Sequence, residues 1–214
     1  MRDWERFAEH TPWFVEGEVV VGAVSPWARE PVDGLPVLST LLTGATVTQV
    51  TMDGRPYELL AWGPDDARRG WVCEPPRADG PVHDTHRRFW AVCGGIVERF
   101  GEPAGWWMNQ NDVLTADAAT TDVASVLDDY GWIWADAGLE LPVDPDAFYV
   151  AAVEANGNLT LVDRQTGQLV LFAPDHAFSE VTPLPGCPEY SLMTIDDVPD
   201  LAAWIEAAAA VWLD

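Results

Sequence analysis

Residues 148–174 read FYVAAVEANGNLTLVDRQTGQLVLFAP, and this stretch predicts three antiparallel strands. Tyr149–Ala155 is a run of apolar residues, mostly of types that favour strands. Asn156-Gly157 supplies two residues that tolerate the positive φ angles of a tight hairpin turn. Leu159–Asp163 and Gln168–Ala173 then form the second and third strands, which makes this stretch the centre of the predicted fold.

A three-stranded sheet of this size needs an apolar layer over one face. The end of the chain offers one, because Asp197 can cap a helix that continues to Trp212. The apolar residues of this segment recur at helical spacing, namely Leu201, Trp204, Ile205, Ala208, Val211 and Trp212. We expect this helix to cover the three strands. Gly167, between the second and third strands, is expected in the left-handed conformation.

Residues 1–82 are expected to form an N-terminal β-rich elaboration. Asp-Gly between two β-rich runs predicts a hairpin, whereas a stretch rich in Pro, Gly, Asp and Arg predicts a linker. The expected elements are a helix over Arg2–Glu9, a strand over Trp13–Val24, a hairpin of Thr46–Met52 with Tyr57–Trp62, and a linker over Gly63–Pro81. A domain boundary is therefore predicted near residue 82, with a second domain over 83–214.

The second domain is expected to mix helices and strands. Asp84 or Thr85 can cap a short helix, and Thr115 can cap another that runs from Ala116 to about Asp128. The strands predicted outside the central three are Ile96–Phe100 and a last edge strand over Tyr190–Ile195.

The chain is strongly acidic, with 35 Asp and Glu against 11 Lys and Arg and a formal net charge of −24. Such a charge disfavours nucleic acid as a partner and favours a basic protein. Three widely spaced cysteines and a charged start without an apolar run predict a cytoplasmic protein without a signal peptide. No stretch reaches the roughly 20 apolar residues of a membrane span.

Two groups of residues are candidates for contact with a partner. Tryptophans in loops are common at binding surfaces, and adjacent carboxylates can meet a basic partner. The candidate partner-binding residues are Trp106, Trp107, Asn109, Asn111, Asp128 and Asp129. A small-ligand or scaffold function remains an alternative for the tryptophan loop.

His83, His86 and Cys93 permit a hydrolase as another alternative. Two histidines could bind a metal ion, or His86 could activate the Cys93 thiol as a nucleophile. A third metal ligand is missing nearby, and Cys93 lies on the apolar face of its expected helix. Helix capping and a buried thiol therefore explain these residues better, and we expect neither a catalytic site nor a cofactor or metal.

Four features in this order resemble the SUKH superfamily, which includes the SMI1/KNR4 family. They are His86–Trp90 leading into Cys93-Gly94-Gly95, the Asn156-Gly157-Asn158 turn, Asp163–Leu171 with its Gln165-Thr166-Gly167, and the helix of Leu201–Ile205. The first departs from the family pattern, in which Asn precedes the Gly pair. The resemblance covers roughly residues 83–213.

The resemblance implies an α+β fold in which helices pack on one side of a mainly antiparallel sheet. It also implies a binding function without catalytic residues. Bacterial members of the family act as immunity proteins that neutralise a cognate polymorphic toxin. Together with the negative charge, this predicts capture of a basic toxin domain such as a nuclease.

Overall fold

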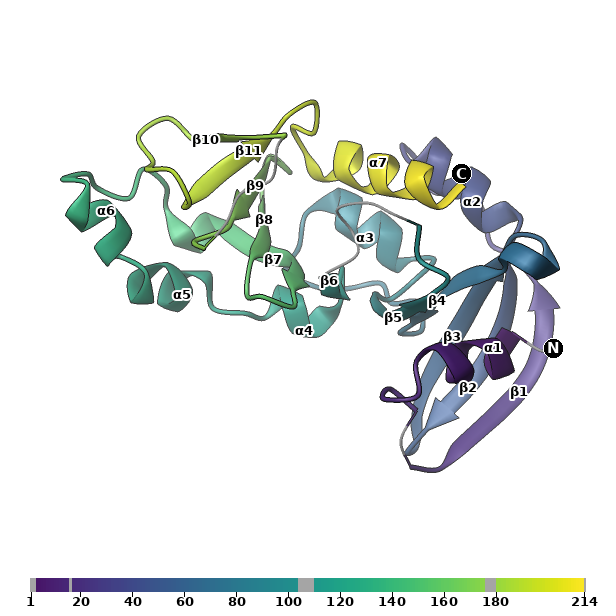
Figure 1. The fold of residues 1–214 in the computed structure, drawn as a ribbon. Helices are drawn as coiled ribbons and strands as arrows, with labels where there is room; N and C mark the ends of the chain where they lie inside the picture. The colour runs from purple at the N-terminus through teal and green to yellow at the C-terminus, as the bar shows by residue number, and fades with distance from the viewer. Residues whose placement is uncertain (1–2, 16, 104–109, 176–179, 214) are drawn as a thin grey trace. The chain divides into compact units, whose positions relative to one another are not determined.

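The structure is a computed structural model that describes residues 3–15, 17–103, 110–175 and 180–213. Every strand pairing that it describes is antiparallel, and helices accompany the strands (Figure 1). The expected α+β class with an antiparallel sheet is thus confirmed.

The chain divides into two compact units, which are described separately. Unit 1 comprises Met1–Ala78, Arg88–Met108 and Ile205–Asp214, and unit 2 comprises Asp79–Arg87 and Asn109–Trp204. The first division lies close to the boundary expected near residue 82. Unit 1 nevertheless takes in two later segments, which the expected single boundary did not anticipate.

Unit 1 is built on five strands in the sheet order β1-β2-β3-β4-β5. Their bounds are Val19–Pro26, Thr46–Met52, Arg55–Trp62, Arg69–Cys73 and Ile96–Phe100. The unit also contains α1 (Asp3–His10), α2 (Pro36–Thr43) and a 3-10 turn over Asp65–Ala67. Both α3 (Asp84–Trp90) and α7 (Leu201–Leu213) contain a division between the units.

The β2–β3 hairpin confirms the expectation from the Asp-Gly pair. Asp53 has φ 47° and Gly54 has φ 76°, so both central residues of the turn are left-handed, and Met52 pairs with Arg55 across it. This conformation matches the right-handed twist of the two flanking strands.

The linker expected over Gly63–Pro81 is wrong, because it contains β4. Val72 is buried and pairs with Leu59 of β3 on one side and Glu98 of β5 on the other. Gly70 belongs to this strand because of close backbone packing: a Cβ there would lie 2.1 Å from the Leu60 carbonyl oxygen. In the sequence, a glycine that close strand packing requires looks the same as a glycine that a loop requires.

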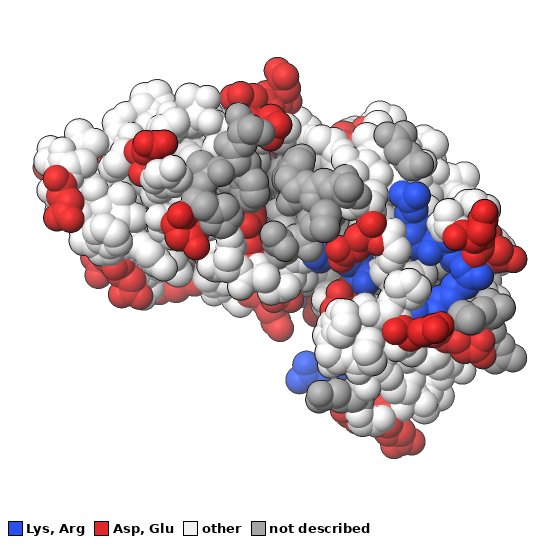
Figure 2. Space-filling view, viewed as in Figure 1, with Lys and Arg blue, Asp and Glu red and all other residues white. Residues whose placement is uncertain are grey.

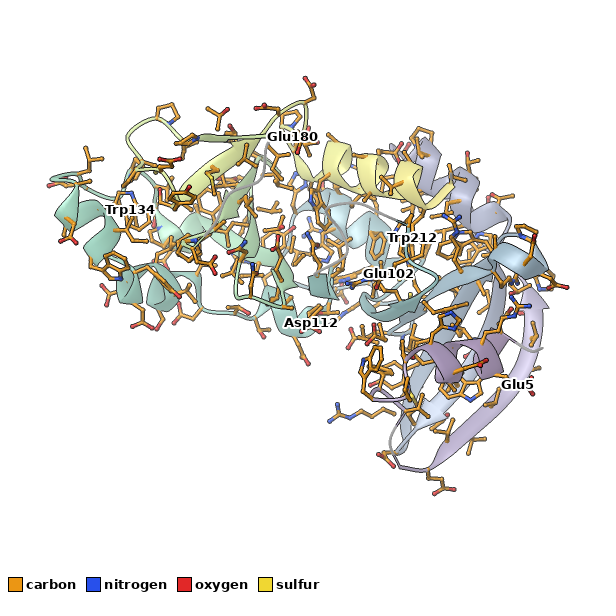
Figure 3. The ribbon with its side chains drawn as sticks, in the orientation of Figure 1. Glu5, Glu102, Asp112, Trp134, Glu180 and Trp212 are labelled. Carbon is orange, nitrogen blue, oxygen red and sulfur yellow. The ribbon has the colours of Figure 1, made fainter. Side chains whose placement is uncertain are left out.

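Three tryptophans form an aromatic cluster in unit 1. Trp62 and Trp71 from β3 and β4 meet edge to face with a centroid distance of 4.8 Å, and Trp212 of α7, labelled in Figure 3, lies 5.6 Å from each. The Trp62 indole also donates to the Trp212 carbonyl oxygen over 3.2 Å. The expectation that this end of the C-terminal helix covers the three strands of residues 148–174 is therefore wrong, since it packs on β3 and β4.

Unit 2 contains six strands in the sheet order β6-β7-β8-β9-β11-β10. In chain order their bounds are Gln110–Val113, Phe148–Glu154, Leu159–Asp163, Leu169–Phe172, Val181–Pro183 and Leu192–Ile195. Its helical elements are α4 (Ala116–Ala119), α5 (Val123–Asp129), α6 (Trp132–Asp136) and a 3-10 turn over Pro145–Ala147.

The meander β7–β8–β9 confirms the three strands predicted from residues 148–174. The first turn differs in detail, because Gly157 is left-handed at φ 93° whereas Asn156 is not among the residues with positive φ. The Glu154 amide donates to the Asn158 carbonyl oxygen over 2.8 Å, which closes a three-residue loop. Gly167 is left-handed at φ 74°, as expected.

The meander is covered by α5 and α6. Leu127, Ile133 and Trp134 share one hydrophobic core with strand residues such as Val150 and Phe172. The segment Ala116–Asp128, which holds α4 and most of α5, was expected as one helix. The chain instead starts two helices there, because Thr115 Oγ1 accepts from the Ala118 amide and Asp122 Oδ1 accepts from the Ser125 amide.

Two expectations for the C-terminal part are corrected. The predicted edge strand over Tyr190–Ile195 becomes β11, which lies between β9 and β10 and is not an edge. Asp197 does not cap the last helix: its φ is 60°, and α7 begins at Leu201. Asp200 caps α7 instead, since its Oδ1 accepts from the Ala203 amide over 2.9 Å.

The unpredicted helix α2 depends on a carboxylate from α7. Leu35 at its N-cap makes no side-chain cap hydrogen bond. The two Glu206 carboxylate oxygens accept from the amides of Val37 and Leu38, over 2.9 and 3.0 Å. A carboxylate here satisfies two amides of the first turn and complements the helix dipole.

We expect Glu206→Ala to lower the free energy of unfolding by about 1–2 kcal/mol, because it removes both amide acceptors. Urea denaturation followed by circular dichroism measures the change. Glu206→Gln, which keeps one acceptor oxygen, should lose less. Glu189→Ala, at an exposed position, serves as the control. Equal stability of Glu206→Ala and the wild type would contradict this function of Glu206.

Candidate partner-binding site

The structure describes three of the six residues predicted to contact a partner. Trp106, Trp107 and Asn109 lie outside the described residues. The other three, Asn111 in β6 and the pair Asp128 and Asp129 at the end of α5, are exposed.

Exposed apolar side chains follow the carboxylate pair directly in the chain. Trp132, the first residue of α6, is 59% exposed, and Tyr130 and Leu139 on either side of this helix are also exposed. Tyr130 is held edge to face on Phe172 of β9 at 5.3 Å. Large exposed aromatics beside charges are typical of binding surfaces, and these residues are not among the six that the sequence predicted to contact a partner.

Negative charge is concentrated in unit 2. It contains 19 Asp and Glu, counted over Asp79–Arg87 and Asn109–Trp204, but only two basic residues, Arg87 and Arg164. Both arginines are engaged: Arg87 pairs with Asp84, and Arg164 donates to the Pro81 carbonyl oxygen. Figure 2 shows acidic side chains over the end of unit 2 that carries α5 and α6, at the left of the view.

His86 belongs to a buried hydrogen-bond network in unit 2. Its Nε2 lies 3.0 Å from the Leu114 carbonyl oxygen, which can only accept, so Nε2 carries the proton. In the neutral ring Nδ1 therefore accepts from the Tyr149 hydroxyl, 3.2 Å away. Burial raises the pKa of the Tyr149 phenol well above its usual value. With both nitrogens engaged, the ring is not a free base for a nucleophile.

His83 begins α3. Its Nδ1 accepts from the Thr85 amide over 3.3 Å, in place of the cap expected from Asp84 or Thr85. Its ring also lies against the backbone of Gly167, where a Cβ would come within 2.7 Å of the ring. His83 is thus engaged in local structure on both sides.

Cys93 lies in unit 1, where its partner is Cys73. Both thiols are buried and hydrogen-bonded to each other. Burial, with a further contribution from Cys93, raises the pKa of the Cys73 thiol well above its usual value. A fully buried thiol is a poor nucleophile, so the burial of Cys93 does not favour the hydrolase alternative.

Nearby in unit 1 is an ion pair that the sequence did not predict. Glu58 of β3 is buried, and Arg29 Nη2 donates to its Oε1 and Oε2 over 2.5 and 2.7 Å. Gln49 Nε2 donates to the same carboxylate over 2.9 Å, and Arg29 Nη1 donates to the Val92 carbonyl oxygen. A buried charge with this many partners is satisfied within its unit.

The described residues contain no group of three or more His, Cys, Asp and Glu side chains placed to hold a metal ion. None of their helices combines the length and apolar character that crossing a membrane requires.

Comparison with known proteins finds no relative of this chain. The chain matches no protein-family description, no curated protein and no solved structure.

Tyr149→Phe should lower the free energy of unfolding by about 1–3 kcal/mol, because His86 Nδ1 loses its donor in a buried site. The pH dependence gives a second readout. Since the folded-state pKa is raised, the unfolded chain loses this proton first, and the wild type should lose stability as the pH rises above about 10. The variant lacks this contribution, so the difference in unfolding free energy between wild type and variant should be smaller at pH 10.5 than at pH 8. An equal difference at the two pH values would contradict this prediction.

Thiol labelling tests the buried pair. At pH 8, iodoacetamide should modify the half-buried Cys187 in the native protein and leave Cys73 unmodified until denaturant is added. Mass spectrometry of peptides identifies the labelled residue, and Cys187→Ser provides a control with little native labelling. Rapid native labelling of Cys73 would show that its thiol is accessible.

Proposed function

We propose that this chain is a non-enzymatic protein-binding module, an immunity protein of the bacterial type that neutralises a basic toxin, such as a nuclease, in the cytoplasm. The observation that carries the proposal is the charge of unit 2, with its 19 acidic residues against two engaged arginines. The exposed Trp132 and Tyr130 add apolar contact area beside Asp128 and Asp129.

The electrostatics explain why the partner should be basic. Carboxylates on a surface speed the approach of a cationic protein and repel the phosphate backbone of a nucleic acid. A nuclease needs a cationic surface to hold its substrate. An acidic protein that covers this surface competes directly with the nucleic acid, so binding and neutralisation would be the same event.

The SMI1/KNR4-like assignment forms part of this proposal. It rests on the residue pattern that runs from His86 to Ile205 and on the family's known binding function. The antiparallel α+β architecture is compatible with it. No enzymatic step is required, since the function consists of occupying the partner's surface.

Co-expression with a toxin encoded beside the gene should protect cells, and the two purified proteins should form a complex. Because steering by charge is screened by salt, the association rate should fall about tenfold or more between 50 and 500 mM NaCl. Stopped-flow fluorescence of the tryptophans measures this rate. Failure to protect, or a complex whose association is independent of salt, would contradict the proposal.

A further inference from the structure

A pocket in unit 1 lies where the pairing of β3 with β4 ends. The final pair at this end of the ladder is Glu58 with Cys73. Continued in the same register, the ladder would place Pro56 opposite Pro75, and Pro76 follows. Proline has no amide hydrogen to donate, so the two segments stop pairing here. The pocket has a volume of about 380 Å³, and its lining residues are Arg55, Pro56, Tyr57, Glu74, Pro75 and Arg77.

Two arginines in this lining differ from the other arginines of the chain. The structure describes ten of the eleven arginines. Eight of these ten engage their guanidinium group in a hydrogen bond or an ion pair. The guanidinium groups of Arg55 and Arg77 make neither with any described residue, although the chain has 35 acidic residues. The two guanidinium groups whose N–H donors the fold does not use therefore line the same pocket.

Arg77 is already held in position by Trp90. Its guanidinium carbon lies 4.5 Å from the centroid of the buried Trp90 ring, and its amide donates to the Trp90 carbonyl oxygen over 2.8 Å. Stacking uses the flat face of the guanidinium group and leaves the N–H donors at its edge for another partner. Arg77 can thus bind an anion with less loss of side-chain freedom than a mobile arginine.

We propose that this pocket binds a small molecule through an oxyanion, a carboxylate or a phosphate, held between Arg55 and Arg77. Guanidinium groups donate pairs of parallel N–H bonds to such groups. Tyr57 and the prolines of the lining offer an apolar wall to the rest of the ligand, and the volume is in the range of small-molecule sites. This inference goes beyond the proposed function, because it assigns a small ligand to unit 1.

The charges favour a small anion over a polyanion or a cation. A cation would be repelled by both arginines, and Glu74 leaves the lining with a net charge of +1, which suits one oxyanion. Unit 1 as a whole is acidic, since it holds the 16 acidic and 9 basic residues that are not in unit 2. A nucleic acid would bring further phosphates against this negative surface.

The first test compares benzoate, the neutral benzamide of nearly the same shape, and phenyl phosphate, each added to the complete chain at low salt. Arginine Nε–H signals are followed by 15N NMR, and Arg55→Gln and Arg77→Gln identify the two signals by their absence. At least one of the two anions should shift both signals. Benzamide should bind at least about 3-fold more weakly than the better anion. The anion that binds more tightly identifies the oxyanion as carboxylate or phosphate.

Charge-matched variants test whether the two arginines form the site. Arg55→Gln and Arg77→Gln should each weaken binding of the better anion about 3- to 10-fold. Arg88→Gln has the same change in charge at an exposed position of unit 1 outside the lining, and should leave this binding unchanged. Arg55 and Arg77 are exposed, so their variants should fold like the wild type, which thermal unfolding checks.

Three results would overturn the inference. The first is no shift of either arginine signal with either anion up to about 20 mM. The second is equal affinity for benzamide and the better anion, which would assign the binding to the apolar wall alone. The third is equal weakening by Arg88→Gln and the two pocket variants, which would show a response to overall charge. The basic partner proposed for unit 2 is not involved in any of these measurements.

Discussion

Unit 2 depends on the apolar contact between α5–α6 and the meander β7–β9. Helices of seven and five residues are too short to be stable alone, so they persist only while they are packed. Leu127, Ile133 and Trp134 supply that packing against the strands. Because their apolar sides are used in this way, Asp128 and Asp129 lie on the outside. The candidate binding surface is therefore a consequence of the core beneath it.

Buried polar side chains in the two units differ in whether they find a hydrogen-bond partner within their own unit. His86 and Tyr149 complete each other's hydrogen bonds, as do Arg29 and Glu58, which makes these groups structural. Trp134 has no such completion among the described residues.

The parts of the fold that were predictable are those with local causes. Asp53-Gly54, Gly167 and Thr115 specify turns and a helix start within a few residues, and all three act as expected. The strand β4 was missed because Gly70 is required by a neighbouring backbone that is distant in sequence. In the same way, α2 is capped by Glu206, 169 residues after Val37, which no local pattern can indicate.

The sequence by itself determined the antiparallel meander, the acidity of the surface and the carboxylate pair at Asp128 and Asp129. The periodicity of a helix also shows which of its sides is apolar, but not which surface that side will meet. Only the tertiary structure decided that Trp212 packs on Trp62 and Trp71, and that Glu206 caps α2. Both depend on contacts between distant segments, whose choice is set by the packing of the whole unit.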